Sequence, residues 1–349
     1  MNAIHKALTV VFPLVVAVTP LAAAESDAKI TPREAWSTFF ASDEVTLGYT
    51  VDSQRPTGAR VAWAFSAQRR TIARGEISRK VEPIEIALRL PPLREGVTLD
   101  TELHVQLIDN RGGVVADHRR VLRIFGRDAF AHRREWLTGL KLILFDTQNK
   151  TQETFDDAGI PYKLARNAAA LRETADGLVV IGEGVSFANH PSLPETLTDL
   201  AAKGVSVLCL APTDGRLAFP GVEDGRPKPE CVSFRGSEII AELDKRLDAR
   251  AWPPSGGMVA STVEVTSRRG RVALSVSGTP RAWPWLEVTY TGQCQKDSDL
   301  PDSGRLIVCG FGLIDNWQAS PTPRYLLMHI LNRLSQEAAE PPHSSSKQE

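Results

Sequence analysis

The sequence lacks a charge imbalance, and it lacks long apolar segments beyond its first residues. Its 349 residues include 41 basic and 42 acidic side chains, a formal net charge of −1. Such a chain has no overall field to attract nucleic acid or an anionic membrane, so we expect no nucleic-acid partner. After residue 24 no apolar run reaches the roughly 20 residues that a membrane helix needs. We therefore expect no membrane span in the mature chain.

Cysteine is scarce, with four in the whole chain. Cys209 and Cys309 lie inside apolar runs, where a cysteine behaves as a small buried hydrophobe. A redox role for either would require an accessible thiol. Cys231 and Cys294 lie in polar stretches flanked by Pro or Gly. If one disulfide forms, we predict the pair Cys231–Cys294, since an oxidising compartment permits it.

The N-terminus has the pattern of a secretory signal peptide, residues 1–24. Lys6 precedes an apolar run from Ala7 to Leu21, and small residues at 22–24 supply a cleavage site. The run is broken by Pro13 and Pro20, which disfavours an uncleaved anchor. We predict an exported protein, periplasmic or extracellular.

Residues 37–126 contain short alternating segments separated by turn signals. Glu44–Val51, Ala59–Ser66 and Leu99–Asp109 show the apolar–polar alternation of half-buried strands. The glycines at 112 and 113 suit a hairpin turn, because they accept positive φ angles. Six or seven strands without a helical pattern predict a β-sandwich of immunoglobulin type.

A basic stretch follows, and its residues 127–138 are expected to be a linker. An anion site for an acidic polysaccharide is one interpretation, and a solvated strand edge is the other. We favour the second, because charged runs usually face water. The arginines concerned are at positions 119, 120, 123, 127, 133 and 134.

Residues 139–335 alternate between apolar strands and helical segments, which predicts an α/β domain with a doubly wound parallel sheet. Strands are expected at 140–145, 162–164, 177–181, 205–210 and 306–310, and helices at 151–158, 168–174, 194–203, 237–247 and 323–334. Residues 215–229 are rich in Gly and Pro and are expected to be loop. Strands at 262–266, 271–277 and 285–291 predict an antiparallel insertion. The polar residues 336–349 predict a disordered tail.

The order of these elements, with the loop Gly182-Glu183-Gly184 after one strand and Ala211-Pro212 after the next, resembles the class I glutamine amidotransferase-like fold, a flavodoxin-like sheet. The resemblance covers about residues 139–335. It implies a nucleophilic cysteine on a strand-to-helix turn, backbone N–H donors in the preceding loop, and a His–Glu pair after a later strand.

The chain does not keep this triad. If Cys209 takes the nucleophile position, Val207 and Ala211 replace the family's glycines, and if Ala211 takes it, no nucleophile is present. No histidine follows the strand at 306–310 directly. His329 lies among apolar helix neighbours, where a packed position is expected, and His190 has no evident partner. We predict no working Cys–His amidase and no catalytic residue of that type.

An acidic rim remains. Ligands bind at the carboxyl ends of strands in doubly wound sheets, and four carboxylates fall there: Asp146, Glu183, Asp214 and Asp315. With Gly182 and Gly184, and with Asn149 and Asn316 close by, they form the candidate ligand site. They suit sugar hydroxyls or a divalent cation, and no other cofactor is expected. The alternative is that they cap helices and tighten turns, and we favour it.

Tryptophans at 252, 283, 285 and 317 fall in or near loops. An exposed indole is a platform for a sugar ring, whereas a buried one covers the sheet, and we favour burial. The sequence therefore supports two functions. One is a non-catalytic binding or assembly protein for a carbohydrate or an envelope protein. The other is a hydrolase acting on a glycan or an amide through the acidic rim.

Overall fold

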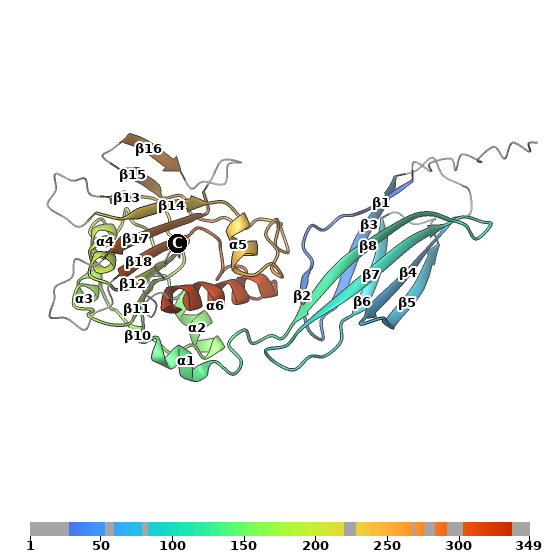
Figure 1. The fold of residues 1–349 in the computed structure, drawn as a ribbon, viewed down its shortest axis with the longest axis horizontal. Coiled ribbons are helices and arrows are strands. Elements are labelled where there is room, and N and C mark those ends of the chain that lie inside the picture. The colour runs from blue at the N-terminus through green and yellow to red at the C-terminus, as the bar shows by residue number, and fades with distance from the viewer. Residues whose placement is uncertain are drawn as a thin grey trace, which may run out of the picture.

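The computed structural model describes residues 28–52, 59–78, 83–219, 228–267, 270–275, 283–291 and 303–336. The predicted signal peptide, Cys294 and nearly all of the predicted tail lie outside these residues. The chain forms two bodies joined by a connector, a β-rich body at one end and a mixed body of sheet and helices at the other (Figure 1). Among the described helices, none has the length and apolarity to cross a bilayer.

The N-terminal body is a β-sandwich of two sheets. One sheet has the order β1-β3-β6 and the other β2-β8-β7-β4-β5. Its strands are β1 (Lys29–Pro32), β2 (Thr38–Phe40), β3 (Glu44–Asp52), β4 (Arg60–Ala67), β5 (Arg70–Ser78), β6 (Ile84–Arg89), β7 (Thr98–Ile108) and β8 (Val114–Phe125).

Alternation of side chains builds the sandwich core. Strand β6 reads Ile-Glu-Ile-Ala-Leu-Arg, and its two isoleucines and its leucine are buried while the residues between them are exposed. Tyr49, Val61 and Leu103 are fully buried in the same core. Strand β1 precedes the predicted boundary at residue 37. Strand β1 was not anticipated, since its four residues are too short for a clear alternation.

The second body contains a seven-stranded mixed sheet of order β10-β9-β11-β12-β18-β17-β14. The strands β9 (Leu142–Phe145), β10 (Lys163–Leu164), β11 (Leu178–Ile181), β12 (Ser206–Leu210) and β18 (Ser303–Cys309) are parallel. Strands β17 (Trp285–Thr291) and β14 (Cys231–Arg235) extend it in antiparallel fashion. Cys231 therefore begins an edge strand and does not lie in the loop that the sequence suggested.

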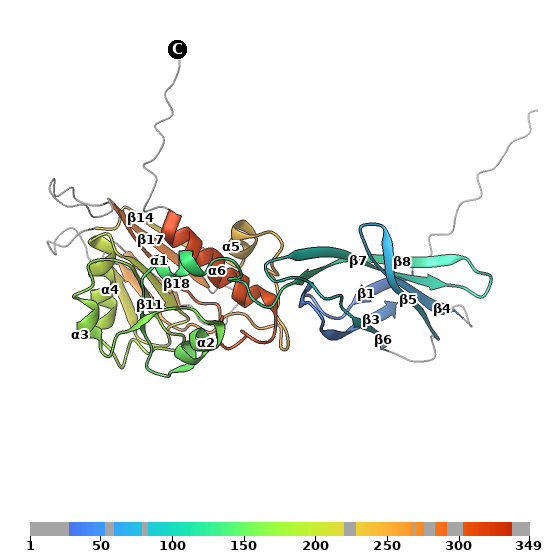
Figure 2. The same ribbon diagram turned by 90° about the horizontal axis from the view of Figure 1, so that it is seen from below.

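Helices cover both faces of this sheet (Figures 1 and 2). One core cluster packs α1 (Arg134–Gly139), α2 (Lys150–Ala158), α5 (Glu238–Leu243) and α6 (Pro321–Gln336) against one face. The other packs α3 (Ala168–Leu171) and α4 (Leu193–Ala202). Strand β11 is buried at every position because both of its faces are covered.

The predicted antiparallel insertion is divided between two sheets. Strands β15 (Glu264–Ser267) and β16 (Gly270–Ser275) pair with each other, and β13 (Arg216–Phe219) pairs with β15 in parallel. Only the third predicted strand, β17, joins the main sheet. Residues 216–219 are strand rather than loop, because Leu217 and Phe219 alternate into the core beside α4.

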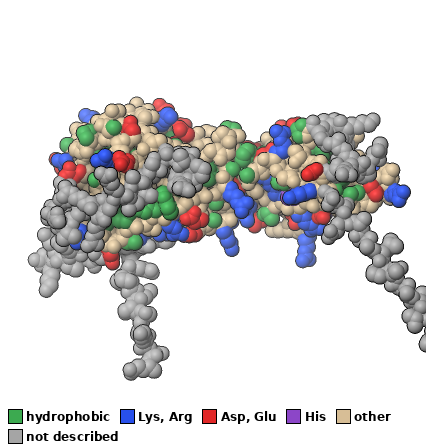
Figure 3. Space-filling model, turned by 90° about the horizontal axis from the view of Figure 1, so that it is seen from above, with side chains coloured by type: hydrophobic (Ala, Val, Ile, Leu, Met, Phe, Trp, Pro, Cys, Tyr) green, Lys and Arg blue, Asp and Glu red, His purple; other side chains and the backbone are tan. Residues whose placement is uncertain are grey.

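The segment expected to be a linker, 127–138, is partly folded. It contains most of α1, and Phe130 and Leu137 are buried in the core of the second body. Arg127 and Arg134 in this segment pair with carboxylates, Arg127 with Asp43 and Arg134 with Asp128. Upstream, Arg119 and Arg123 pair with Glu102 and Asp100. These contacts favour the structural interpretation of the basic stretch over an anion site. On the face shown in Figure 3, acidic and basic side chains are interspersed.

The two bodies meet through a network around Asp248. Its carboxylate accepts hydrogen bonds from the backbone N–H of Ser37 at 2.8 Å and from the N–H and hydroxyl of Thr38 at 2.9 and 2.6 Å. The backbone N–H of Asp248 donates to Thr322 Oγ1 at 3.2 Å. Beside them the rings of Phe125 and Tyr325 pack with centroids 4.7 Å apart. Apolar and polar contacts therefore fasten β2 and β8 to α6.

Candidate functional site

The carboxyl ends of β9, β11, β12 and β18 form one rim, because these four strands run parallel in adjacent positions. Each is followed by a turn that carries one of the acidic residues singled out in the sequence. The contacts of each carboxylate determine whether the rim is available to a ligand.

Asp146 caps the helix that follows β9. Its Oδ2 accepts hydrogen bonds from the backbone N–H groups of Thr151 at 2.8 Å and Gln152 at 3.0 Å, at the start of α2. Its Oδ1 accepts from the N–H of Gln148 at 3.0 Å. This is the pattern of a helix N-terminus satisfied by a carboxylate. Asp146 thus has the structural role that the sequence analysis favoured.

Glu183 joins two turns of the rim and is only 3% exposed. Its Oε2 accepts a hydrogen bond from the backbone N–H of Ile314 at 2.8 Å, and its Oε1 accepts from that of Asp315 at 3.0 Å. Burial raises the pKa of Glu183 to about 7, although these backbone hydrogen bonds lower it. The raised pKa makes the Glu183 carboxyl a candidate proton donor or acceptor near neutral pH.

Asp214 and Asp315 are held by neighbours at the surface. Asp214 accepts a hydrogen bond from Ser186 Oγ at 2.5 Å, and Asp315 forms an ion pair with Lys150 at 3.0 Å. The hydrogen bond with Asp315 raises the pKa of Lys150. Within the described residues, no three Asp, Glu, His or Cys side chains are grouped so that they could hold a metal ion. The prediction of a cation on this rim gains no support from the arrangement.

In the loop Gly182-Glu183-Gly184, the backbone N–H groups already donate hydrogen bonds to other atoms of the protein. The N–H of Gly182 donates to Phe145 O at 2.9 Å, and the N–H of Gly184 donates to Ala211 O at 3.2 Å. Between them, the N–H of Glu183 donates to Thr151 Oγ1 at 2.8 Å. All three donors are therefore occupied within the chain. An added Cβ on Gly182 would lie 2.8 Å from Asp146 Cγ, so this glycine serves close packing.

The turn after β12 is strained at its first residue. Ala211 has a φ of +33°, in a region that non-glycine residues seldom adopt. Its N–H donates to Cys309 O at 2.6 Å, and its side chain is 1% exposed. The strained position at the strand end is therefore occupied by an alanine methyl. Cys209, two residues earlier, is fully buried within the strand, and burial raises the pKa of its thiol far above the usual range.

His329 and His190 make contacts other than hydrogen bonds or ion pairs to the four rim carboxylates. His329 lies on α6, and its Nε2 is 3.1 Å from Asp244 Oδ2. The sequence predicts a packed position for this histidine, and the structure adds a contact with a carboxylate. Burial would raise the pKa of Asp244, but hydrogen bonds from His329 and Arg246 hold it well below its usual range. His190 packs edge-on against Phe145, with ring centroids 5.4 Å apart. Neither histidine approaches a cysteine in these contacts.

The tryptophans are largely buried, as expected. Trp252 and Trp285 are fully buried and Trp317 is 5% exposed, whereas Trp283 is 39% exposed beside Phe234. Among the four tryptophans considered, only Trp283 offers its surface to a sugar ring. The predicted disulfide between Cys231 and Cys294 stays a prediction, because Cys294 lies outside the described residues.

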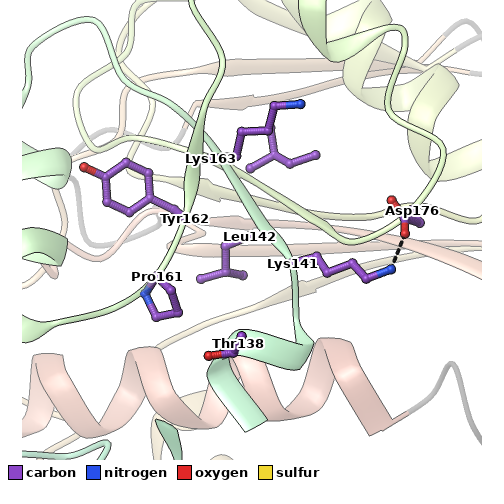
Figure 4. Close-up of a pocket in the computed structure, with 8 residues that line it drawn as sticks. Thr138, Lys141, Leu142, Pro161, Tyr162, Lys163 and Asp176 are labelled. Carbon is purple, nitrogen blue, oxygen red and sulfur yellow. Dashed lines mark hydrogen bonds and ion pairs between the residues drawn. The ribbon is translucent and has the colours of Figure 1, made fainter. Parts of the chain in front are cut away.

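Two cavities lie away from the acidic rim. The first, of about 380 Å³, is at the amino ends of β9 and β10. Figure 4 shows Leu142 and Pro161 among its lining residues, and Lys141 turned toward Asp176, with which it forms an ion pair at 2.5 Å. The second, of about 310 Å³, lies where the connector, α2 and α6 meet the sandwich. Sequence reasoning missed the second cavity, because its walls come from segments up to about 230 positions apart.

No known family matches this chain, and no curated protein does so significantly. Solved structures give weak likenesses. Fibronectin(III)-like modules of Clostridium thermocellum CbhA are 16% identical over 29% of this chain and 47% of theirs, with a TM-score of 0.20. A family 76 glycoside hydrolase from a bovine Bacteroides thetaiotaomicron strain is 11% identical over 30% and 24%, with a TM-score of 0.20.

A Paenibacillus cycloisomaltooligosaccharide glucanotransferase, complexed with cycloisomaltoheptaose, is 9% identical over 54% of this chain and 27% of that one, with a TM-score of 0.23. In each case the match spans less than half of the other protein's length. These scores are too low to assign a function or an overall fold.

Proposed function

We propose that the protein is an exported, non-catalytic binding or assembly protein. In this proposal, an immunoglobulin-like sandwich is attached to a degenerate amidotransferase-like domain of flavodoxin-like topology. Its ligand is a carbohydrate or a protein of the cell envelope. The parallel order β10-β9-β11-β12-β18 and the helices on both faces support the assignment of the second domain.

The observation that carries the proposal is the state of the loop at 182–184. An amidase of the resembled type needs free backbone N–H groups to stabilise an oxyanion. Here the N–H groups of Gly182, Glu183 and Gly184 are all donated to atoms of the protein. It also needs a thiolate with an adjacent base, and Ala211 stands at the strained turn where the thiol is expected.

One experiment tests binding and turnover together. The purified mature chain is applied to a glycan array and to an envelope extract, and it is incubated with glutamine, amide and glycan substrates. We expect a specific ligand and no turnover. The absence of any ligand in either assay would remove the support for this function.

The alternative, a hydrolase using the acidic rim, is favoured by one observation. Glu183 is buried with a pKa near 7, as a general acid or base requires. Measurable turnover that is lost in Glu183→Gln or Asp146→Asn, at an unchanged melting temperature, would establish the alternative. An equal loss of stability in both variants would instead show that Glu183 and Asp146 have structural roles.

A further inference from the structure

The cavity at the junction is built from both bodies of the protein. Its lining includes residues of α1 and α2, the two helices that follow the connector in the chain (Figure 1). The sandwich contributes Glu95, the connector Arg127 and Asp128, and the second body the end of α2 and the loop after β18. A ligand in this cavity would therefore contact the two bodies at once, which a site on the acidic rim would not do.

Its guanidinium groups are fixed before any ligand arrives. Arg324 donates to Trp317 O at 2.7 Å, to Arg127 O at 2.8 Å and to Gln318 Oε1 at 2.5 Å. Its guanidinium also lies 4.6 Å from the ring centroid of Phe40. Arg134 donates to Ala158 O at 2.7 Å and to Asp128 Oδ2 at 2.8 Å. Walls held in this way lose little conformational freedom on binding.

The lining has no net charge and both kinds of hydrogen-bonding group. Three arginines face three carboxylates, so the cavity has no preference for an ion of either sign. A hydroxyl group both donates and accepts hydrogen bonds, and it can therefore use carboxylate and guanidinium partners side by side. The apolar residues of the lining, Ala129, Phe130 and Trp317, are at most 6% exposed, so a ligand in this cavity meets mainly polar groups.

Two polar side chains of the lining remain available to a ligand. Asp157, exposed at the end of α2, has no hydrogen-bond partner among the described residues. Gln318 uses its Oε1 for Arg324, and its amide N–H groups have no acceptor within the described part of the chain. The volume of about 310 Å³ is at the lower end of the range for ligand cavities, roughly 300–1,000 Å³, which suits a small ligand.

We propose that this cavity binds the end of a neutral saccharide, one or two sugar rings long, through hydrogen bonds of its hydroxyl groups to Asp157 and Gln318. The proposal rests on the carbohydrate branch of the proposed function. It adds the location of the site and the neutral character of the sugar. Carboxylate–hydroxyl hydrogen bonds are charge-assisted and are stronger than neutral ones.

The test is titration calorimetry of the full mature chain with neutral oligosaccharides of two to six glucose or N-acetylglucosamine units. The variant is Asp157→Ala combined with Gln318→Ala, and the control is Glu153→Gln, an exposed carboxylate on the same helix outside the cavity. We expect the double variant to bind at least tenfold more weakly and the control to bind like the wild type. Both should retain the wild-type melting temperature.

The other outcomes separate the two proposals. Binding that is equal in the wild type and the double variant would overturn this site and leave the carbohydrate function standing. Binding of oligogalacturonate in place of the neutral sugars would overturn the neutral ligand. If no saccharide binds the wild type while an envelope protein does, the site proposal fails and the protein-binding branch survives.

Discussion

The carboxylate of Asp248 in the second body accepts two hydrogen bonds from Thr38 in the sandwich, one from its backbone N–H at 2.9 Å and one from its hydroxyl at 2.6 Å. Both residues are buried, and the hydroxyl of Thr38 also lies 3.1 Å from that of Thr322. Burial raises the pKa of Asp248 although these hydrogen bonds lower it. These hydrogen bonds connect two segments that are about 210 positions apart in the sequence.

Asp248→Ala should destabilise the protein by about 3 kcal/mol, because it leaves the buried N–H groups of Ser37 and Thr38 without an acceptor. Urea unfolding followed by tryptophan fluorescence measures the change. Since the residue fastens the two bodies, we also expect the single transition to separate into two. The matched control is Asp176→Asn, which removes a surface ion pair with Lys141 and should change stability by less than about 1 kcal/mol.

Gly304 allows α4 and β18 to approach closely. An added Cβ would lie 1.8 Å from the backbone oxygen of Ala201, and backbone atoms on both sides cannot move aside cheaply. We expect Gly304→Ala to lower the free energy of unfolding by more than about 3 kcal/mol. Gly139→Ala is the control, because nothing lies within 4 Å of its Cβ position at the end of α1. A wild-type stability for both variants would contradict the packing described.

Because of Glu183, the free energy of unfolding should decrease as the pH rises from about 5 to about 8. Its pKa is raised from 4.5 to about 7, so the folded state holds a proton that the unfolded state has already released in this range. Stability therefore decreases as the pH rises through that window, by at most about 3 kcal/mol. Glu183→Gln carries no such proton and should flatten this dependence.

The measurement compares urea unfolding of the wild type and Glu183→Gln at pH 5 and pH 8. Asp244 does not disturb it. The pKa of Asp244 is lowered in the fold, so its stabilising contribution is present above its ordinary pKa and is lost only under more acidic conditions. An identical pH slope in the two proteins would show that Glu183 does not titrate in this window.

The thiols of Cys209 and Cys309 should resist labelling in the native state. Both are fully buried, and burial raises the pKa of each far above the usual range. We expect a thiol reagent to modify them only as the protein unfolds. Rapid native labelling of either, identified by peptide mass, would contradict this burial and restore a redox role.

Cys231 is exposed at the edge of the sheet, and its labelling tests the predicted disulfide. If it is bridged to Cys294, the native protein should react at this residue only after mild reduction, because a disulfide has no free thiol. Labelling of Cys231 without reductant would exclude the pair. Cys231→Ser serves as the control that assigns the reactive site.

The sequence by itself determined the order of the elements in the second body. Apolar runs such as Leu178–Ile181 and residues 207–210 are strands because burial on both faces leaves no polar position in them. It also indicated that Asp146 caps a helix, since that role is local and depends on residues five and six positions away. Local hydrogen bonding and periodicity are recorded in neighbouring residues, and sequence patterns detect them.

Only the tertiary structure decided what the rim and the junction contain. Glu183 is bound by the backbone of Ile314, about 130 positions later, and backbone donors have no residue-specific signature in a sequence. The same reason hid the occupied N–H groups of the glycine loop and the pairing of Asp248 with Thr38. Sequence periodicity identifies which side chains are buried, whereas long-range packing determines which atoms they meet.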